Sequence, residues 1–352
     1  MWKLQAEYLA SISSLLLYNT FVLDHFHNEN KKVLKILAFL FKECNNSCSF
    51  CFQKRYADSI KTIPFFNNNI KQYCNAFDEA LFDFKNYSET TVSLMGGELF
   101  FEKTTTRGIL ELINHLSGYN GIKLRFTSNL IDSDIGKIRV VMDRCHTKGV
   151  SVEFFTSFDF GNLRFHRDSD RASFIHSIDE VKKLCKQYSL QFGIETIRTK
   201  KMLESYLAED EDFVTIRSMS ETTNICQNEL IGTPESRLTA DESTLLWKLV
   251  IEKTPRVSDL RSHFFETGRN CLNIVRRTII GNSVIDGCGS QKLGILDKDN
   301  KEDRVFDMLN KYGCYTCKYF SRCSLKCPYD YYYDRCDKKE VFDYIDKNGI
   351  IT

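Results

Sequence analysis

The feature that most constrains the fold is a regular alternation of short apolar runs with amphipathic stretches, which extends from about residue 33 to residue 217. Strands that alternate with helices of this length predict a parallel sheet covered by helices, and hence an α/β fold. The expected strands are Lys35–Phe41, Thr91–Met95, Ile122–Thr127, Val150–Phe158, Leu190–Ile197 and Phe213–Arg217. The expected helices between them are Ile70–Phe84, Thr106–Leu116, Ile135–Cys145, Phe174–Tyr188 and Lys201–Ala208.

Bulk composition excludes several classes of protein. The 352 residues are enough for one large domain and a smaller one. A formal net charge of +1 gives no electrostatic reason to expect nucleic acid or a membrane surface as partner. The apolar segment Ser11–Leu23 lacks the basic start and cleavage site of a signal peptide, and no apolar run is long enough to span a membrane. We therefore expect a cytoplasmic protein in which the grouped cysteines among its 14 bind metal rather than form disulfides, whereas Cys74, Cys145 and Cys185, on expected helices, are core thiols.

Three cysteines follow the first expected strand closely. Cys44, Cys48 and Cys51 have the spacing Cys-x3-Cys-x2-Cys and lie on the loop that leaves the carboxyl end of that strand. Such loops form the functional face of α/β barrels. Three thiolates can converge on one centre and favour Fe–S, Zn or Cu(I), but structural zinc normally needs a fourth protein ligand. No fourth Cys or His is close in sequence, so one iron of a cubane would stay open for a small molecule.

This loop resembles the signature of the radical S-adenosylmethionine (SAM) enzymes. The resemblance implies that the three cysteines hold a [4Fe–4S] cluster, whose fourth iron SAM chelates through its amino and carboxylate groups. It also implies that Phe50 lies beside the adenine. A zinc loop is the alternative.

The end of the second expected strand reads Met95-Gly96-Gly97-Glu98. Two glycines allow the backbone to approach a ligand closely, and turn amides can bind a carboxylate. One strand–helix unit after the cysteines, this segment resembles the family segment that orients the methionine part of SAM. A plain tight turn is the alternative.

Polar residues also end the next expected strands. The third strand ends in Thr127-Ser128-Asn129, and the fifth contains Glu195 and Thr196. The family resemblance implies that Ser128, Asn129, Glu195 and Thr196 face SAM. Glu195 is a candidate catalytic residue, although a polar residue in a buried strand also finds partners within the protein.

The fourth strand end resembles the Ser-x-Asp-Gly segment of peptide-modifying radical SAM enzymes, which a His and an Arg follow. Here the residues are Ser157, Asp159, His166 and Arg171, with Phe160 inserted before the glycine. The resemblance implies that Ser157 binds the ribose or amino end of SAM and that Arg171 pairs with its carboxylate. Asp159 and His166 are candidate catalytic residues, and each could equally make a structural loop bond.

The C-terminal region carries a second cysteine array, which resembles the SPASM domain pattern over Cys314-x2-Cys317-x5-Cys323-x3-Cys327. The resemblance implies two auxiliary [4Fe–4S] clusters and three clusters in all. Their ligands would be Cys271, Cys288 and Cys327 for cluster I, and Cys314, Cys317, Cys323 and Cys336 for cluster II. With three ligands, cluster I has an open iron for a substrate thiolate, unless a distant residue such as Cys226 closes it. A zinc ribbon is the alternative, although seven cysteines fit two zinc sites poorly.

Together these resemblances imply four segments. They are an N-terminal hairpin or lid (1–32), a partial (β/α)6 TIM-like barrel (33–220), a linker with a bridging helix (221–265), and a cysteine-rich SPASM domain (266–352). The bridging helix is expected to begin at a capping box, Thr239-Ala240-Asp241-Glu242, and to run to about Glu252.

The implied activity is reductive cleavage of SAM to a 5′-deoxyadenosyl radical. The radical would abstract a hydrogen from a ribosomally made peptide, in which a thioether or carbon–carbon cross-link is installed oxidatively. The implied partners are a precursor peptide, a separate leader-recognition protein, and an electron donor such as flavodoxin or ferredoxin. Oxidation of a small molecule and sulfatase-type maturation are alternatives. The second is weakened because Gly289 occupies the position of an acidic base in that pattern. A non-catalytic zinc or Fe–S module is a third reading.

Overall fold

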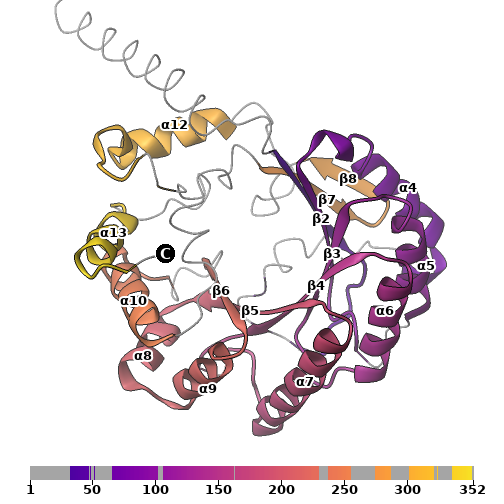
Figure 1. Cartoon of the computed structure of the whole chain (residues 1–352), viewed down its shortest axis with the longest axis horizontal. Coiled ribbons are helices and arrows are strands. Elements are labelled where there is room, and N and C mark those ends of the chain that lie inside the picture. Colours follow the sequence, from indigo (N-terminus) through magenta and orange to yellow (C-terminus); the bar gives the residue numbers. More distant parts are fainter. Residues whose placement is uncertain are drawn as a thin grey trace, which may run out of the picture.

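The computed structural model describes residues 32–46, 48, 51, 66–101, 106–161, 163–229, 237–254, 274–286, 301–320, 323 and 335–350. Within these ranges, eight strands form one curved sheet in the order β6-β5-β4-β3-β2-β1-β7-β8 (Figure 1). All neighbouring strands are parallel except the hairpin of β7 and β8. The strands are β1 (Val33–Phe39), β2 (Glu89–Met95), β3 (Ile122–Ser128), β4 (Ser151–Phe158), β5 (Gln191–Arg198), β6 (Asn224–Glu229), β7 (Ile274–Ile280) and β8 (Ser283–Asp286).

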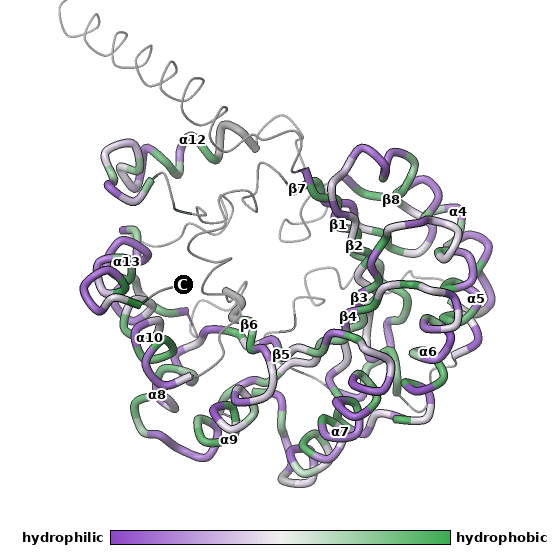
Figure 2. Tube along the Cα trace, viewed as in Figure 1, coloured by the Kyte–Doolittle hydropathy of each residue, from purple (hydrophilic) through white to green (hydrophobic). Residues whose placement is uncertain are grey.

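Helices cover the outer face of this sheet (Figure 1). The side chains of β3 alternate, so Leu124 and Phe126 are fully buried towards the helices while Lys123 and Arg125 are half-buried on the inner face. Figure 2 shows the same mixture of hydrophobic and hydrophilic positions along the covering helices. The helices are α4 (Ile70–Ala80), α5 (Thr106–Leu116), α6 (Ile135–Thr147), α7 (Asp168–Gln187), α8 (Lys200–Ala208), α9 (Glu211–Ser220), α10 (Ala240–Lys253), α12 (Lys301–Lys311) and α13 (Lys338–Lys347).

This architecture confirms the α/β class, the parallel sheet and the first five expected strands, with boundaries that differ by a few residues. The five expected helices are present as α4 to α8, and α7 begins six residues before its expected start. The curved, helix-covered sheet has the form of a partial TIM-like barrel (Figure 1).

The sixth expected strand, Phe213–Arg217, is wrong: these residues belong to α9. The helix begins at Asp210, whose side chain accepts a hydrogen bond from the Phe213 amide at 3.1 Å. Phe213 and Ile216 are buried three residues apart, as the face of a helix requires. The sixth parallel strand is instead β6, which lies beyond residue 220, where we expected the barrel segment to end.

Beyond the barrel segment, β7 returns to the sheet and pairs in parallel with β1, so β1 lies between β2 and β7. The buried side chain of Arg277 on β7 holds this strand to the end of α4. Its guanidinium donates to both carboxylate oxygens of Asp83, at 2.6 and 2.9 Å, and to the carbonyl of Ala80 at 2.6 Å. The hydrogen bonds from Arg277 lower the pKa of Asp83 below that of an unfolded carboxyl group. The contact therefore stabilises the fold at any pH above the unfolded pKa, and this stabilisation is lost as the pH falls through the lowered pKa.

The expected capping box of α10 is confirmed: Thr239 and Glu242 each bind the other's backbone amide. α13 packs against α10, and the hydroxyl of Ser243 on α10 donates to Asp337, just before α13, at 2.5 Å. No described helix is long and apolar enough to cross a membrane.

We expect Arg277→Ala to lower the free energy of unfolding by roughly 3–5 kcal/mol, because it leaves the Asp83 carboxylate without its bidentate partner. Chemical denaturation of the two proteins measures the difference. The neighbouring exposed Arg276→Ala is the matched control and should change stability by no more than about 0.5 kcal/mol. Equal losses in the two variants would contradict the assigned role of Arg277.

Candidate functional site

The cysteine loop leaves the carboxyl end of β1 and bears three thiols that influence one another. Cys44 lies at the exposed edge, Cys48 is buried and Cys51 is half-buried. Enough protein surrounds the Cys44 thiol that desolvation raises its pKa to about 11, and the charges of Cys48 and Cys51 act in the same direction. A turn in which the Cys51 amide donates to the Cys48 carbonyl at 3.2 Å brings these two residues together. The structure therefore gathers the three cysteines that the sequence singled out.

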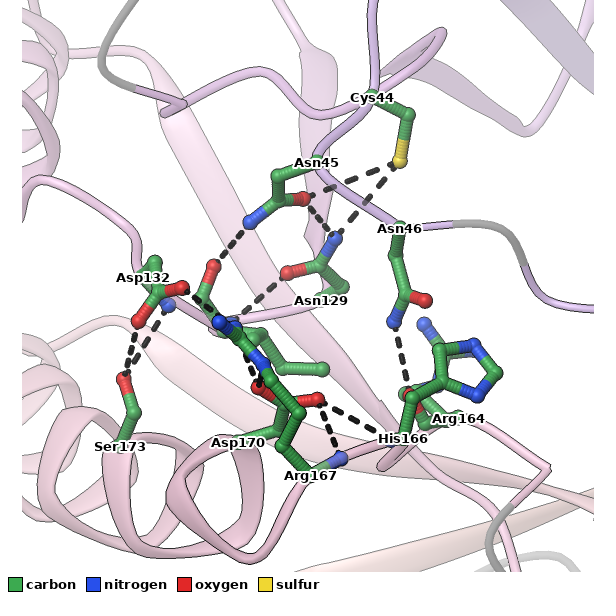
Figure 3. A network of polar contacts seen from close by, with 11 residues as sticks. Cys44, Asn45, Asn46, Asn129, Asp132, Arg164, His166, Arg167, Asp170 and Ser173 are labelled. Carbon is green, nitrogen blue, oxygen red and sulfur yellow. Dashed lines mark hydrogen bonds and ion pairs between the residues drawn. The ribbon is translucent and has the colours of Figure 1, made fainter.

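Three asparagines fix the loop on the ends of later strands (Figure 3). The side-chain amide of Asn129 donates to Asn45 Oδ1 at 2.8 Å and contacts Cys44 Sγ at 3.9 Å. Asn45 in turn donates to the carbonyl of Ile131, and Asn46 donates to the carbonyl of Arg164 at 3.0 Å. Asn129 was an expected site residue. The contributions of Asn45 and Asn46 were missed, although both lie inside the cysteine motif.

The Gly96–Gly97 turn lets the cysteine loop cross the end of β2. Both glycines have positive φ angles, +112° and +48°. A Cβ atom on Gly97 would lie 1.6 Å from the carbonyl oxygen of Glu43, and one on Gly96 would lie 2.5 Å from that of Phe41. The Glu98 amide donates to the Glu43 carbonyl at 2.8 Å, which closes the contact. The glycine pair is therefore required by the approach of the loop that precedes Cys44.

Glu98 ties this turn to the end of β3. Its carboxylate is buried and accepts from the Ser128 hydroxyl at 2.6 Å, the Asn129 amide at 2.6 Å and the Phe100 amide at 3.1 Å. Burial raises the pKa of Glu98, and these three donors oppose the shift. The expected residues Glu98, Ser128 and Asn129 thus form one cluster beside Cys44, held by protein donors.

A buried ion pair stands on the other side of the loop. Asp159 follows β4, and its Oδ2 accepts from Arg164 Nε at 2.5 Å. Burial raises the pKa of both Asp159 and Cys48, and in each case the charge of Arg164 opposes the shift. Arg164 was missed by the sequence reasoning, because only the elements of the fold place this loop residue against Cys48.

Arg171, the expected partner of the SAM carboxylate, pairs with Asp212 of α9, whose other oxygen accepts from the Gly161 amide at 2.7 Å. The Arg171 guanidinium also lies 5.1 Å from the centre of the Phe165 ring. Ser157, the other expected contact of this segment, is half-buried and lies opposite Glu195 in the strand register. The His166 side chain is exposed, and its backbone amide donates to Asp170 at the start of α7 (Figure 3).

The inner face of the sheet is charged. Arg125 on β3 donates twice to Glu153 on β4, at 2.7 and 3.0 Å, and lies 3.8 Å from Glu195 on β5. Its guanidinium also stacks 4.3 Å above the ring of Phe155. Glu195 therefore faces the interior next to a guanidinium, while the neighbouring Thr196 is buried and donates to the Cys226 carbonyl at 3.4 Å.

Four cysteines gather again in the C-terminal region. Burial raises the pKa of the Cys314 thiol, and the charges of Cys336, Cys323 and Cys317 add to this shift. Successive backbone turns, Cys317 to Cys314 at 3.0 Å and Cys323 to Phe320 at 3.4 Å, fold the segment back on itself. The four expected ligands of cluster II thus come together. Phe50 and the expected cluster I ligands Cys271, Cys288 and Cys327 lie outside the described residues.

The described side chains do not form a ready-made site for a single metal ion. Among the described residues, no group of three or more His, Cys, Asp or Glu side chains could hold a metal ion as it stands.

Buried polar atoms near the carboxyl end of β4 suggest room for a ligand. Within the described part of the chain, Thr156 Oγ1, Asp159 Oδ1 and Arg171 Nη1 are buried without a hydrogen-bond partner. Such atoms are rare in folded proteins and commonly mark a missing water or ligand. They come from the segments in which the sequence predicts contacts to SAM.

We expect Gly97→Ala to destabilise the protein far more than Gly149→Ala. Both residues have positive φ, but a Cβ on Gly149 meets no atom within 4 Å. The control should cost about 1 kcal/mol of unfolding free energy, because it suffers backbone strain alone. Gly97→Ala adds a collision with the Glu43 backbone and should also reduce iron incorporation on anaerobic reconstitution. Similar unfolding energies for the two variants would disprove the close approach.

Comparison with known proteins places the fold. No protein-family model matches the chain, and no curated protein matches it in sequence. Solved structures do match. Native anSMEcpe with bound AdoMet and Cp18Cys peptide superimposes with a TM-score of 0.57 at 14% identity, over 90% of this chain and 97% of that chain. The same protein with bound AdoMet and Kp18Cys peptide gives 0.56 at 13% identity, over 90% and 98%.

At this level of identity the likeness establishes the fold and not the activity. It extends over 90% of this chain and 97% of the anSMEcpe chain. anSMEcpe is a radical SAM enzyme with a SPASM domain. The chain therefore has the fold of such an enzyme, in agreement with the resemblance that its cysteine motifs carry.

Proposed function

We propose that this protein is a radical SAM enzyme that oxidatively modifies a peptide. The observation that carries the proposal is the meeting of Cys44, Cys48 and Cys51 at the carboxyl end of a parallel, helix-covered sheet. Barrel enzymes place their chemistry at this end. Three thiolates suit a cubane with one open iron better than structural zinc, which normally takes four protein ligands.

The chain's own residues would have distinct tasks at this site. Cys44, Cys48 and Cys51 would hold the cluster, which together with bound SAM would supply the radical that abstracts hydrogen. The Gly96–Gly97 turn and Glu98 hold the loop in place. The aromatic ring of Phe50 would lie against the adenine.

Polar side chains at the ends of β3, β4 and β5 would bind the rest of SAM. Arg171 is suited to a carboxylate, because Asp212 orients its guanidinium and leaves Nη1 buried without a partner in the described part of the chain. The remaining proposed contacts are Ser128, Asn129, Ser157 and Thr196. Asp159, His166 and Glu195 remain candidates for proton transfer. Of these, the exposed His166 imidazole can be reached most easily from the solvent side of the loop.

The C-terminal cysteines would provide the oxidising half of the reaction. We propose that Cys314, Cys317, Cys323 and Cys336 bind auxiliary cluster II, and that Cys271, Cys288 and Cys327 bind cluster I. An auxiliary cluster that accepts the substrate electron makes the net reaction an oxidation, such as formation of a thioether or carbon–carbon cross-link. An external donor such as flavodoxin or ferredoxin would reduce the SAM-binding cluster, and either a separate protein or the rim of the barrel would recognise the leader.

A peptide is the proposed substrate class because anSMEcpe, which has the same fold, binds the Cp18Cys peptide. That likeness also keeps sulfatase-type maturation as a second candidate, which the residue after Cys288 disfavours. The decisive test is anaerobic reconstitution, which should give about twelve irons per chain for three clusters. The reconstituted protein is then incubated with two peptides, one encoded by a gene next to its own and one Cys-containing peptide from a sulfatase. Mass spectrometry measures the mass change of each. A mass loss of two hydrogens in the first peptide supports cross-linking, modification of the second supports the sulfatase-type candidate, and colourless zinc protein rejects both.

We expect Cys44→Ala, Cys48→Ala and Cys51→Ala each to abolish reductive SAM cleavage, because each removes one of the three proposed cluster ligands. Release of 5′-deoxyadenosine, measured by chromatography under dithionite, monitors the reaction. Cys74→Ala on the covering helix α4 is the control and should retain cleavage, since the charges that act on this thiol are those of Asp78 and Glu111. Cleavage that persists in any of the three loop variants would refute the ligand assignment.

Cys314→Ala and Cys317→Ala should separate SAM cleavage from product formation. Both variants leave the loop after β1 intact, so we expect 5′-deoxyadenosine to be released while modified peptide is not formed. The ratio of the two products, measured in one reaction, reports the coupling. Normal amounts of modified peptide from both variants would rule out electron acceptance at cluster II.

A further inference from the structure

Arg164, which forms a buried ion pair with Asp159, has no task in the mechanism above. The side chains of Asp159 and Arg164 are only 2% and 12% exposed, and Nε and Oδ2 are 2.5 Å apart. Removing two charges from water is costly, and such pairs frequently stabilise a protein no better than apolar residues would. A pair in this position therefore invites a functional explanation.

The pair lies directly against the cysteine loop. The carbonyl of Arg164 accepts the side-chain amide of Asn46 at 3.0 Å (Figure 3), and the preceding residue, Leu163, packs against the cluster of Cys48 and Cys51. Residues Leu163 and Arg164 are thus fixed relative to the cysteines. Burial then ensures that little water screens its charge.

Both charges of the pair are held in place beside the loop. Arg164 is tied to the loop by the bond from Asn46 and to Asp159 by the 2.5 Å ion pair, and Asp159 directly follows β4. A cluster bound at the loop would therefore lie beside one fixed cation and one fixed anion, whose effects on it have opposite signs.

We infer that Arg164 sets the reduction potential of the cluster at Cys44, Cys48 and Cys51, and that Asp159 moderates and orients this charge. The inference rests on the proposed function. A reduced cluster carries one more negative charge than an oxidised one, so a fixed cation beside it favours reduction and a fixed anion opposes it. Arg164 is thus a positioning residue that acts on the cofactor through its field and takes no part in bond making.

The test is the midpoint potential of the SAM-responsive cluster in the reconstituted full-length protein, followed by electron paramagnetic resonance. At a fixed potential, Arg164→Gln should lower the ratio of reduced to oxidised cluster by about threefold or more, and Asp159→Asn should raise it. Arg164→Lys, which keeps the charge, should lie close to the wild type. Loosening of the loop would move both neutral variants in the same direction, so the opposite signs are specific to an electrostatic role.

The exposed Arg167 is the matched control, since it is an arginine three residues away whose partners are Asp170 and Asp132. Arg167→Gln should leave the potential unchanged. The inference is overturned if Arg164→Gln has no effect or raises the potential, or if Asp159→Asn lowers it; no shift in Asp159→Asn removes Asp159 from the assignment. If Arg164→Gln fails to take up iron, Arg164→Lys and Asp159→Asn still decide, because the predicted direction of each is fixed. A wild-type protein without any SAM-responsive cluster would reject the proposed function instead.

Discussion

The close passage of two backbone segments, at Glu43 and Gly97, is the constraint on which the site depends. The loop after β1 can cross the end of β2 only because residue 97 has no side chain, and the Glu98 amide then binds the Glu43 carbonyl. From this crossing the Glu98 carboxylate reaches to Ser128 and Asn129 on β3, and Asn129 reaches back to Asn45. One steric requirement thus joins three strand ends around Cys44.

Burial and charge oppose each other throughout this region. Desolvation raises the pKa of the Cys44 and Cys48 thiols, so both are protonated at neutral pH in the absence of metal. Binding of the proposed cluster would have to release these protons, so its affinity would depend on pH. The guanidinium of Arg164 would reduce that cost at Cys48. The same opposition recurs at Glu98, where three donors offset the burial of the carboxylate.

Local sequence patterns predicted the regular part of the fold and the cysteine groups, and failed where partners are distant. The apolar run at Phe213 is too short to distinguish a strand from one face of a helix, and the Asp210 cap decides for the helix. The sequence pattern did not predict β6, because this edge strand has the polar sequence Asn-Ile-Cys-Gln-Asn-Glu and lacks an apolar run. Arg164 and Arg277 could not be assigned, because each obtains its role from elements that are remote in sequence or joined by an irregular loop.

The position of β1 between β2 and β7 has a consequence for how the molecule is made. β2 emerges from the ribosome soon after β1, but β7 ends only at residue 280. Until then the strand that leads into the cysteine loop has one unpaired edge, with a row of free amides and carbonyls. Pairings of such long sequence separation form slowly. The nascent chain therefore exposes its first three cysteines well before the sheet around them is complete. Iron and sulfide delivered during synthesis would meet these cysteines before β7 has paired with β1.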